Sequence, residues 1–120
     1  MNDKVRMAVE EFLEIADQRE VDRHKFFHDK GLHVESIYSE DWEKTPLFVF
    51  EDGDIEATVI PLIRHGLGAT IGFSIMPKYF EIVKGDQLLI RGTDIVKLPV
   101  IEGRPGSWTV KEKGVINRQN

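Results

Sequence analysis

Three of the four histidines of this 120-residue chain lie within ten positions of one another, in the segment DRHKFFHDKGLH at residues 22–33. His24 and His28 are four residues apart, so on a helix their imidazoles would share one face at a spacing that transition metals accept. His33 lies just beyond the predicted end of that helix, and Glu35 could supply an oxygen ligand. The sequence therefore gives one metal hypothesis, with His24, His28, His33 and Glu35 as the ligands.

Other features of the same segment favour ordinary surface histidines. Residues 24–28 have the sequence HKFFH, so the glutamate that activates a zinc-bound water in the HExxH signature is absent. Lys25 and Lys30 would repel a divalent cation. On the predicted helix the two histidines also fall on the polar side. We therefore expect no cofactor, although a metal-binding or small-ligand-binding enzyme with a histidine-rich site stays open as an alternative.

The usual signatures of catalysis are missing elsewhere in the chain. There is no cysteine, which excludes thiolate zinc sites and cysteine nucleophiles, and neither GxSxG nor SxxK occurs. The glycines of HGLGATIG, at residues 65–72, are followed by a β-branched, alternating segment and not by the helix that a dinucleotide site requires. The sequence therefore favours a protein without catalytic residues.

The charge distribution is the most distinctive feature of the sequence. The net charge is −5, but residues 34–56 carry eight acidic side chains and one basic side chain, a net of −7. A tyrosine and a tryptophan lie among these carboxylates, and both residue types are frequent at the energetic centres of protein interfaces. The predicted partner-binding residues are Tyr38, Glu40, Asp41, Trp42, Glu43, Asp52 and Asp54. We expect them to bind a basic site on a larger protein, as an adaptor, an immunity protein or an inhibitor from a phage or mobile element would.

A nucleic-acid-binding function is a second alternative. Residues 57–120 carry nine basic and five acidic side chains, with aromatic residues between them, which is typical of a sheet that binds single strands. The overall acidity of the chain argues against general nucleic-acid binding, because such binding depends on clustered lysine and arginine. The same charge asymmetry is also compatible with self-association as a homodimer.

The N-terminal residues predict an amphipathic helix. Over residues 3–19 apolar side chains recur with i, i+3, i+4 and i+7 spacing, which places them on one helical face. The helix is expected to continue to about residue 30, with a break near residues 19–22, and Gly31 is a natural C-terminal stop.

The rest of the chain predicts antiparallel strands. Alternating or apolar segments occur at residues 32–38, 47–51, 55–63, 69–76, 79–83, 87–92, 94–101 and 107–112. Asp52-Gly53-Asp54 and Lys84-Gly85-Asp86 are turn sequences that predict two hairpins, and residues 114–120 are expected to form a frayed tail. The predicted fold is α+β, with one or two helices packed on an antiparallel sheet or open barrel of about six strands, in one domain spanning residues 1–120.

Composition predicts a soluble, cytoplasmic protein with no membrane contact. The chain is 41% apolar and 31% charged, as is typical of globular proteins. Its N-terminus is too acidic for a signal peptide, and no apolar segment reaches the roughly 18 residues that a membrane span requires.

Overall fold

The N-terminal helix forms where its apolar pattern predicts it. The computed structural model describes residues 1–36, 46–64, 68–70, 76–84 and 91–117, and its first element is α1, Asp3–Ala16. Asn2 caps this helix, because its Oδ1 accepts a hydrogen bond from the backbone N of Lys4 at 2.7 Å. The predicted break is confirmed, since a second helix, α2, begins only at Arg23 and ends at Asp29.

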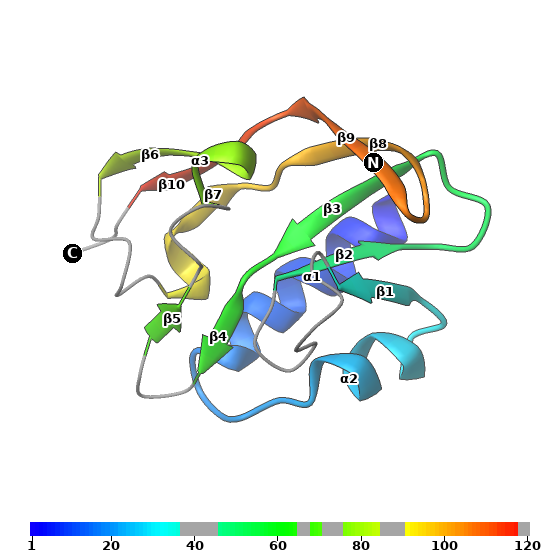
Figure 1. Ribbon diagram of the computed structural model, residues 1–120. Helices are drawn as coiled ribbons and strands as arrows, with labels where there is room; N and C mark the ends of the chain where they lie inside the picture. Colours follow the sequence, from blue (N-terminus) through cyan, green and yellow to red (C-terminus); the bar gives the residue numbers. More distant parts are fainter. Residues whose placement is uncertain (37–45, 65–67, 71–75, 85–90, 118–120) are drawn as a thin grey trace.

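Gly31 terminates the helical region as predicted. Its φ of +75° lies in the left-handed region that favours glycine. The chain then reverses into β1, His33–Ser36, which is an edge strand of the main sheet. This tight reversal places β1 directly beside α2 (Figure 1).

The main sheet has five antiparallel strands in the order β1-β2-β3-β8-β9. Its other members are β2 (Leu47–Phe50), β3 (Glu56–Ile60), β8 (Val100–Arg104) and β9 (Ser107–Glu112). The hairpin predicted at Asp52-Gly53-Asp54 joins β2 to β3, with Leu47 opposite Ile60 and Val49 opposite Thr58. The fold is therefore α+β, with an antiparallel main sheet as predicted, and the described strands do not close into a barrel.

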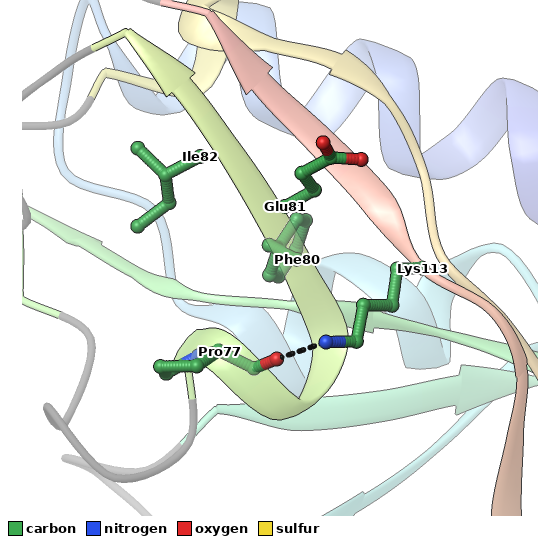
Figure 2. A pocket seen from close by; sticks show the side chains of 5 residues that line it. All are labelled: Pro77, Phe80, Glu81, Ile82 and Lys113. Carbon is green, nitrogen blue, oxygen red and sulfur yellow. Dashed lines mark hydrogen bonds between the residues drawn. The ribbon is translucent and has the colours of Figure 1, made fainter.

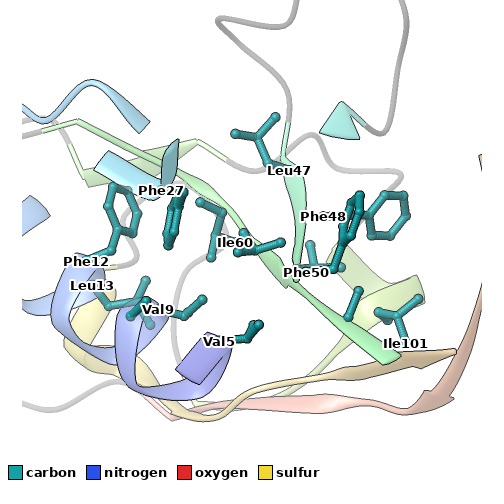
Figure 3. Close-up of a cluster of buried hydrophobic side chains, with 14 of the residues drawn as sticks. Val5, Val9, Phe12, Leu13, Phe27, Leu47, Phe48, Phe50, Ile60 and Ile101 are labelled. Atoms are coloured by element: carbon teal, nitrogen blue, oxygen red, sulfur yellow. The ribbon is translucent and has the colours of Figure 1, made fainter. Parts of the chain in front are cut away.

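Both faces of the central strands are buried. Alternate side chains of a strand point to opposite faces, and Figure 3 shows Val5, Val9 and Leu13 of α1 directed toward Ile60 of β3. Phe48 and Phe50 belong to the other face, where both rings contact Trp108 of β9. Phe48 also contacts Tyr79 of α3, Met76–Tyr79. The core consequently lies on both sides of the β2–β3 hairpin.

A second sheet contains a strand that the sequence does not predict. Its order is β6-β10-β7, formed by β6 (Phe80–Lys84), β10 (Gly114–Asn117) and β7 (Ile95–Lys97). The expectation of a frayed tail from residue 114 is wrong, because β10 is the central strand and Ile116 is fully buried. β10 also runs parallel to β6, so the sheets are not entirely antiparallel.

Two predicted strands are each divided at a proline, which cannot donate a backbone hydrogen bond to a neighbouring strand. Residues 55–63 divide at Pro61 into β3 and β4 (Leu62–Arg64), and β4 pairs with β5 (Gly68–Thr70). Residues 94–101 divide at Leu98-Pro99 into β7 and β8. Most of the predicted strands at 69–76 and 87–92 lies outside the described residues.

A short 3-10 helix, η1 (Gly92–Asp94), packs against the end of α1. A Cβ atom at Gly92 would lie 2.3 Å from the backbone oxygen of Leu13, so only glycine allows this approach. None of the described helices is long and apolar enough to cross a membrane.

Candidate functional site

The three clustered histidines line one open pocket between α2 and β1. The pocket has a volume of about 470 Å³. Its lining residues are His24, Lys25, His28, Leu32, His33 and Val34. The three histidines that the sequence singles out therefore line the same pocket, together with Lys25, Leu32 and Val34, which the sequence did not assign to a site.

Local folding holds α2 at this position. Asp22 caps the helix by accepting a hydrogen bond from the backbone N of Lys25 at 3.1 Å. Phe27, on the buried side of α2, has no exposed surface and lies 5.3 Å from the ring of Phe12 in α1. Because Phe27 anchors the helix to the core, the polar side of α2 is presented to the pocket.

His33 belongs to the edge strand β1, which forms one side of the pocket. Its ring stacks on Phe50 of the neighbouring strand, with 5.8 Å between ring centroids and an interplanar angle of 22°. The two residues are directly opposite each other in the β1–β2 pairing. The imidazole of His33 therefore lies on the face of the sheet that carries Phe50, opposite the face that packs on α1.

Burial lowers the pKa of two side chains at the N-terminal end of α2. Burial lowers the pKa of Arg23 from 12.5 to about 10. Burial also lowers the pKa of His24, as does the nearby positive charge of Arg23, and Asp22 acts in the opposite direction. His24 is therefore held toward its neutral form.

The structure does not gather the four side chains of the metal hypothesis into one cluster. Among the described residues, which include all four, no three His, Asp or Glu side chains lie close enough together to hold a metal ion. Glu35 is engaged elsewhere, because its Oε1 accepts a hydrogen bond from the backbone N of Gly106 at 2.7 Å. The geometry therefore gives no support to His24, His28, His33 and Glu35 as a ligand set.

Of the seven predicted partner-binding residues, the structure describes Asp52 and Asp54. Tyr38, Glu40, Asp41, Trp42 and Glu43 lie outside the described residues. Asp52 is exposed at the β2–β3 turn. Asp54 has a structural role in that turn, because its Oδ2 accepts a hydrogen bond from the backbone N of Glu51 at 2.9 Å.

Two further carboxylates of the acidic segment are paired within the chain. Glu51 lies 2.8 Å from Nζ of Lys4. Glu56 lies 2.9 Å from Nζ of Lys111 and also pairs with the N-terminal ammonium of Met1. Hydrogen bonds from that ammonium, and then from Lys111, lower the pKa of Glu56 from 4.5 to about 2. The negative charge of this region is therefore partly neutralised by residues distant in the sequence.

Two of the C-terminal basic residues form ion pairs within the chain. Lys97 pairs with Glu112, and Lys111 pairs with Glu56. Single-strand binding would also use aromatic rings on the same surface. Trp108, one of the aromatic residues of this half, packs against Phe48 and Phe50 instead. Nucleic-acid binding by the C-terminal half stays a prediction.

A second pocket of about 350 Å³ lies beside α3 and β6. Figure 2 shows Lys113 reaching toward α3, where its Nζ donates a hydrogen bond to the backbone oxygen of Pro77 at 2.6 Å. Phe80 and Ile82 supply apolar lining, and Glu81 is the acidic residue of this pocket.

Comparisons with protein families, with curated proteins and with solved structures found no match to this chain. Functional inference therefore rests on the chemistry of the chain itself.

Proposed function

We propose that this chain is a non-catalytic binding domain that docks on a basic surface of a larger protein through its acidic segment. The observation that carries the proposal is that an apolar side chain and a carboxylate are both exposed at the β2–β3 turn. Ile55 is 76% exposed, and Asp52 is exposed three residues before it. An apolar contact flanked by charge is a common arrangement at the centre and rim of a protein interface.

The backbone of this turn is fixed before any partner arrives. The N of Asp54 donates a hydrogen bond to the oxygen of Glu51 at 2.9 Å, and Ile55 accepts one from the N of Gly103 at 2.9 Å. Asn2 also holds the turn, because its Nδ2 donates to Glu51 at 2.9 Å. A preorganised turn loses little conformational entropy on binding, which supports its use as a docking element.

Asp52 differs from the carboxylates that stabilise the fold. It makes no ion pair with any described residue, whereas Glu51 and Glu56 both do. Its charge is therefore available to a basic partner. The sequence extends the same acidic character to residues 38–43, which we include in the proposed surface on the basis of their composition.

The test is affinity purification from the source organism, followed by mass spectrometry and measurement of the dissociation constant of any stoichiometric complex. The test variant is D52K/I55E. The matched control is M7E/E14K, which makes the same two kinds of change at exposed positions on α1. Met7 is 64% exposed, so the control should fold as well as the test variant does.

We expect D52K/I55E to weaken the complex at least about tenfold, equivalent to about 1.4 kcal/mol, while M7E/E14K binds as the unaltered chain does. Complex formation should also weaken as salt is raised, because the interface is expected to pair opposite charges. Equal binding by the two variants, or the lack of any stoichiometric protein partner, would refute the proposal.

A further inference from the structure

The second sheet, β6-β10-β7, has one face on the core and one face exposed. Phe80 and Ile116 are buried, and Ile82 and Ile95 pack against the core, so these four side chains define the inner face. Neighbouring residues of a strand point to opposite faces. Figure 2 shows this on β6, where the side chains of Glu81 and Ile82 leave the strand in opposite directions. The outer face therefore includes Glu81, Val83, Val96 and Val115.

The outer face exposes apolar side chains. Val83 is 62% exposed and Val96 is 53% exposed. Together with Met7 and Ile55 they are the large apolar side chains that the described residues expose, so two of the four lie on this one face. Val115 of the central strand lies between them, is half-buried, and is not among the side chains that pack against the core. Exposed apolar patches of this kind mark interaction sites.

Two opposite charges flank Val115 on the outer face. In the parallel β10–β6 pairing Val115 is opposite Glu81, and in the antiparallel β10–β7 pairing it is opposite Lys97. Directly opposite residues point to the same face of a sheet. The register shift between Val115 and Ile116 turns Lys97 to the outer face, although Ile95 belongs to the inner face. Glu81, Val115 and Lys97 therefore form a row across the sheet with a negative end, an apolar centre and a positive end.

This row is complementary to itself under one two-fold rotation. If two such sheets pack face to face about an axis parallel to β10, β6 of each copy lies over β7 of the other. Each Glu81 then faces Lys97 of the other copy, and Val115 meets its own counterpart on the axis. An axis perpendicular to the strands would place Glu81 against Glu81, and like charges oppose association. The charges therefore favour the axis parallel to β10.

The same rotation covers the exposed valines. Val83 follows Ile82 and Val96 follows Ile95, and both isoleucines are opposite Ile116 of β10. Both valines consequently lie within one position of Ile116 along the sheet. The rotation therefore brings Val83 of one copy close to Val96 of the other.

From these observations we propose that the chain forms a homodimer through the outer face of the second sheet. Figure 1 places this sheet at the opposite end of the molecule from the β2–β3 turn. Dimerisation is therefore independent of the docking function proposed above. The three strands have only three to five residues each, so the interface is small. We expect a weak dimer, with a dissociation constant on the order of 10–100 μM.

Both charged side chains are available for this contact. Glu81 is exposed and makes no ion pair with any described residue. Lys97 pairs with Glu112, but about half of each of these two side chains is exposed. An ammonium group donates three hydrogen bonds, so Lys97 can contact Glu112 of its own chain and Glu81 of the other copy together.

The first test is analytical ultracentrifugation of the full chain at concentrations from well below to well above the expected dissociation constant. V83T/V96T should raise the dissociation constant at least about fivefold, because threonine keeps the shape of valine but adds a hydroxyl group that the interface would desolvate. The matched control is M7Q, which removes an exposed apolar side chain from α1 and should dimerise as the unaltered chain does.

Charge reversal tests the arrangement of the two copies. E81K and K97E should each raise the dissociation constant at least about fivefold, because each change places like charges together twice in the dimer. The double variant E81K/K97E restores opposite charges and should return the dissociation constant to within about twofold of the unaltered chain. The control E112Q removes only the partner of Lys97 within its own chain and should dimerise at least as well as the unaltered chain.

Three results would overturn the proposal. The first is a monomer at every concentration. The second is the same dissociation constant for V83T/V96T and M7Q, which would place the interface on another surface. The third is an E81K/K97E dimer no tighter than that of either single variant, which would exclude the axis parallel to β10. All the substituted positions are exposed, and circular dichroism of each variant verifies that the fold is intact.

Discussion

The carboxylate of Asp17 is hydrogen-bonded to the backbone of Gly92, with 2.7 Å between Oδ1 and N. Its second oxygen accepts a hydrogen bond from the N of Thr93 at 3.0 Å. Asp17 is the residue that follows α1, and Gly92 begins η1 just before the second sheet. One side chain therefore joins the N-terminal helix to a segment 75 residues away in the sequence.

Replacing Asp17 by alanine should lower the free energy of unfolding by about 1–2 kcal/mol, because two backbone N–H groups lose a charged acceptor. Urea denaturation monitored by circular dichroism measures the change. The matched control is Asp29→Ala, at an exposed position on α2, which should change stability by less than about 0.5 kcal/mol. An equal decrease in the free energy of unfolding in both variants would show that the contact between Asp17 and η1 contributes nothing to stability.

Glu56 should make stability depend on pH in the acid range. The pKa of Glu56 is about 2 in the folded chain, compared with an ordinary value of 4.5, so its contribution is complete above pH 4.5 and is lost as the pH falls toward 2. Glu56→Gln should therefore be less stable than the unaltered chain at pH 7, and the difference should shrink between pH 4.5 and pH 2. Thermal unfolding across this range measures the effect.

The matched control for this prediction is Glu102→Gln. Glu102 is opposite Glu56 in the β3–β8 pairing but is exposed. Its replacement should leave acid stability close to that of the unaltered chain. If the difference in stability between Glu56→Gln and the unaltered chain stayed constant from pH 7 to pH 2, it would contradict the pairing of Glu56 with Lys111 and the N-terminal ammonium.

Ile116→Ala should lower the free energy of unfolding by about 2–5 kcal/mol, because the side chain is fully buried in the central strand of the second sheet. Val115→Ala, at the half-buried neighbouring position, should lower the free energy of unfolding by less than Ile116→Ala does. Chemical denaturation compares the two variants. A loss below about 0.5 kcal/mol for Ile116→Ala would instead support the frayed tail that the sequence predicts.

Sequence reasoning succeeded where the signal is local. The apolar spacing of α1 and the stop at Gly31 depend on residues within a few positions of one another. The β2–β3 hairpin likewise follows from its Asp-Gly turn. These elements formed as predicted because short-range geometry and periodicity determine them.

Sequence reasoning failed where pairing is distant. Residues 114–117 carry too short a pattern to identify a strand, and β10 exists because it pairs with β6 on one side and β7 on the other. The divisions at Pro61 and Pro99 did have a local signal, since proline removes a donor from the strand. That signal does not indicate which sheet each half then joins.

The sequence by itself determined the charge of the acidic segment, the helix that carries His24 and His28, and the turn that brings the chain back at Gly31. Only the tertiary structure decided which of the charged side chains are available to a binding partner. Lys4 and Lys111 neutralise Glu51 and Glu56, whereas Asp52 remains exposed. The composition gives the number of charged side chains. Whether one of them can contact a partner depends on which distant side chain the fold places within a few ångströms of it.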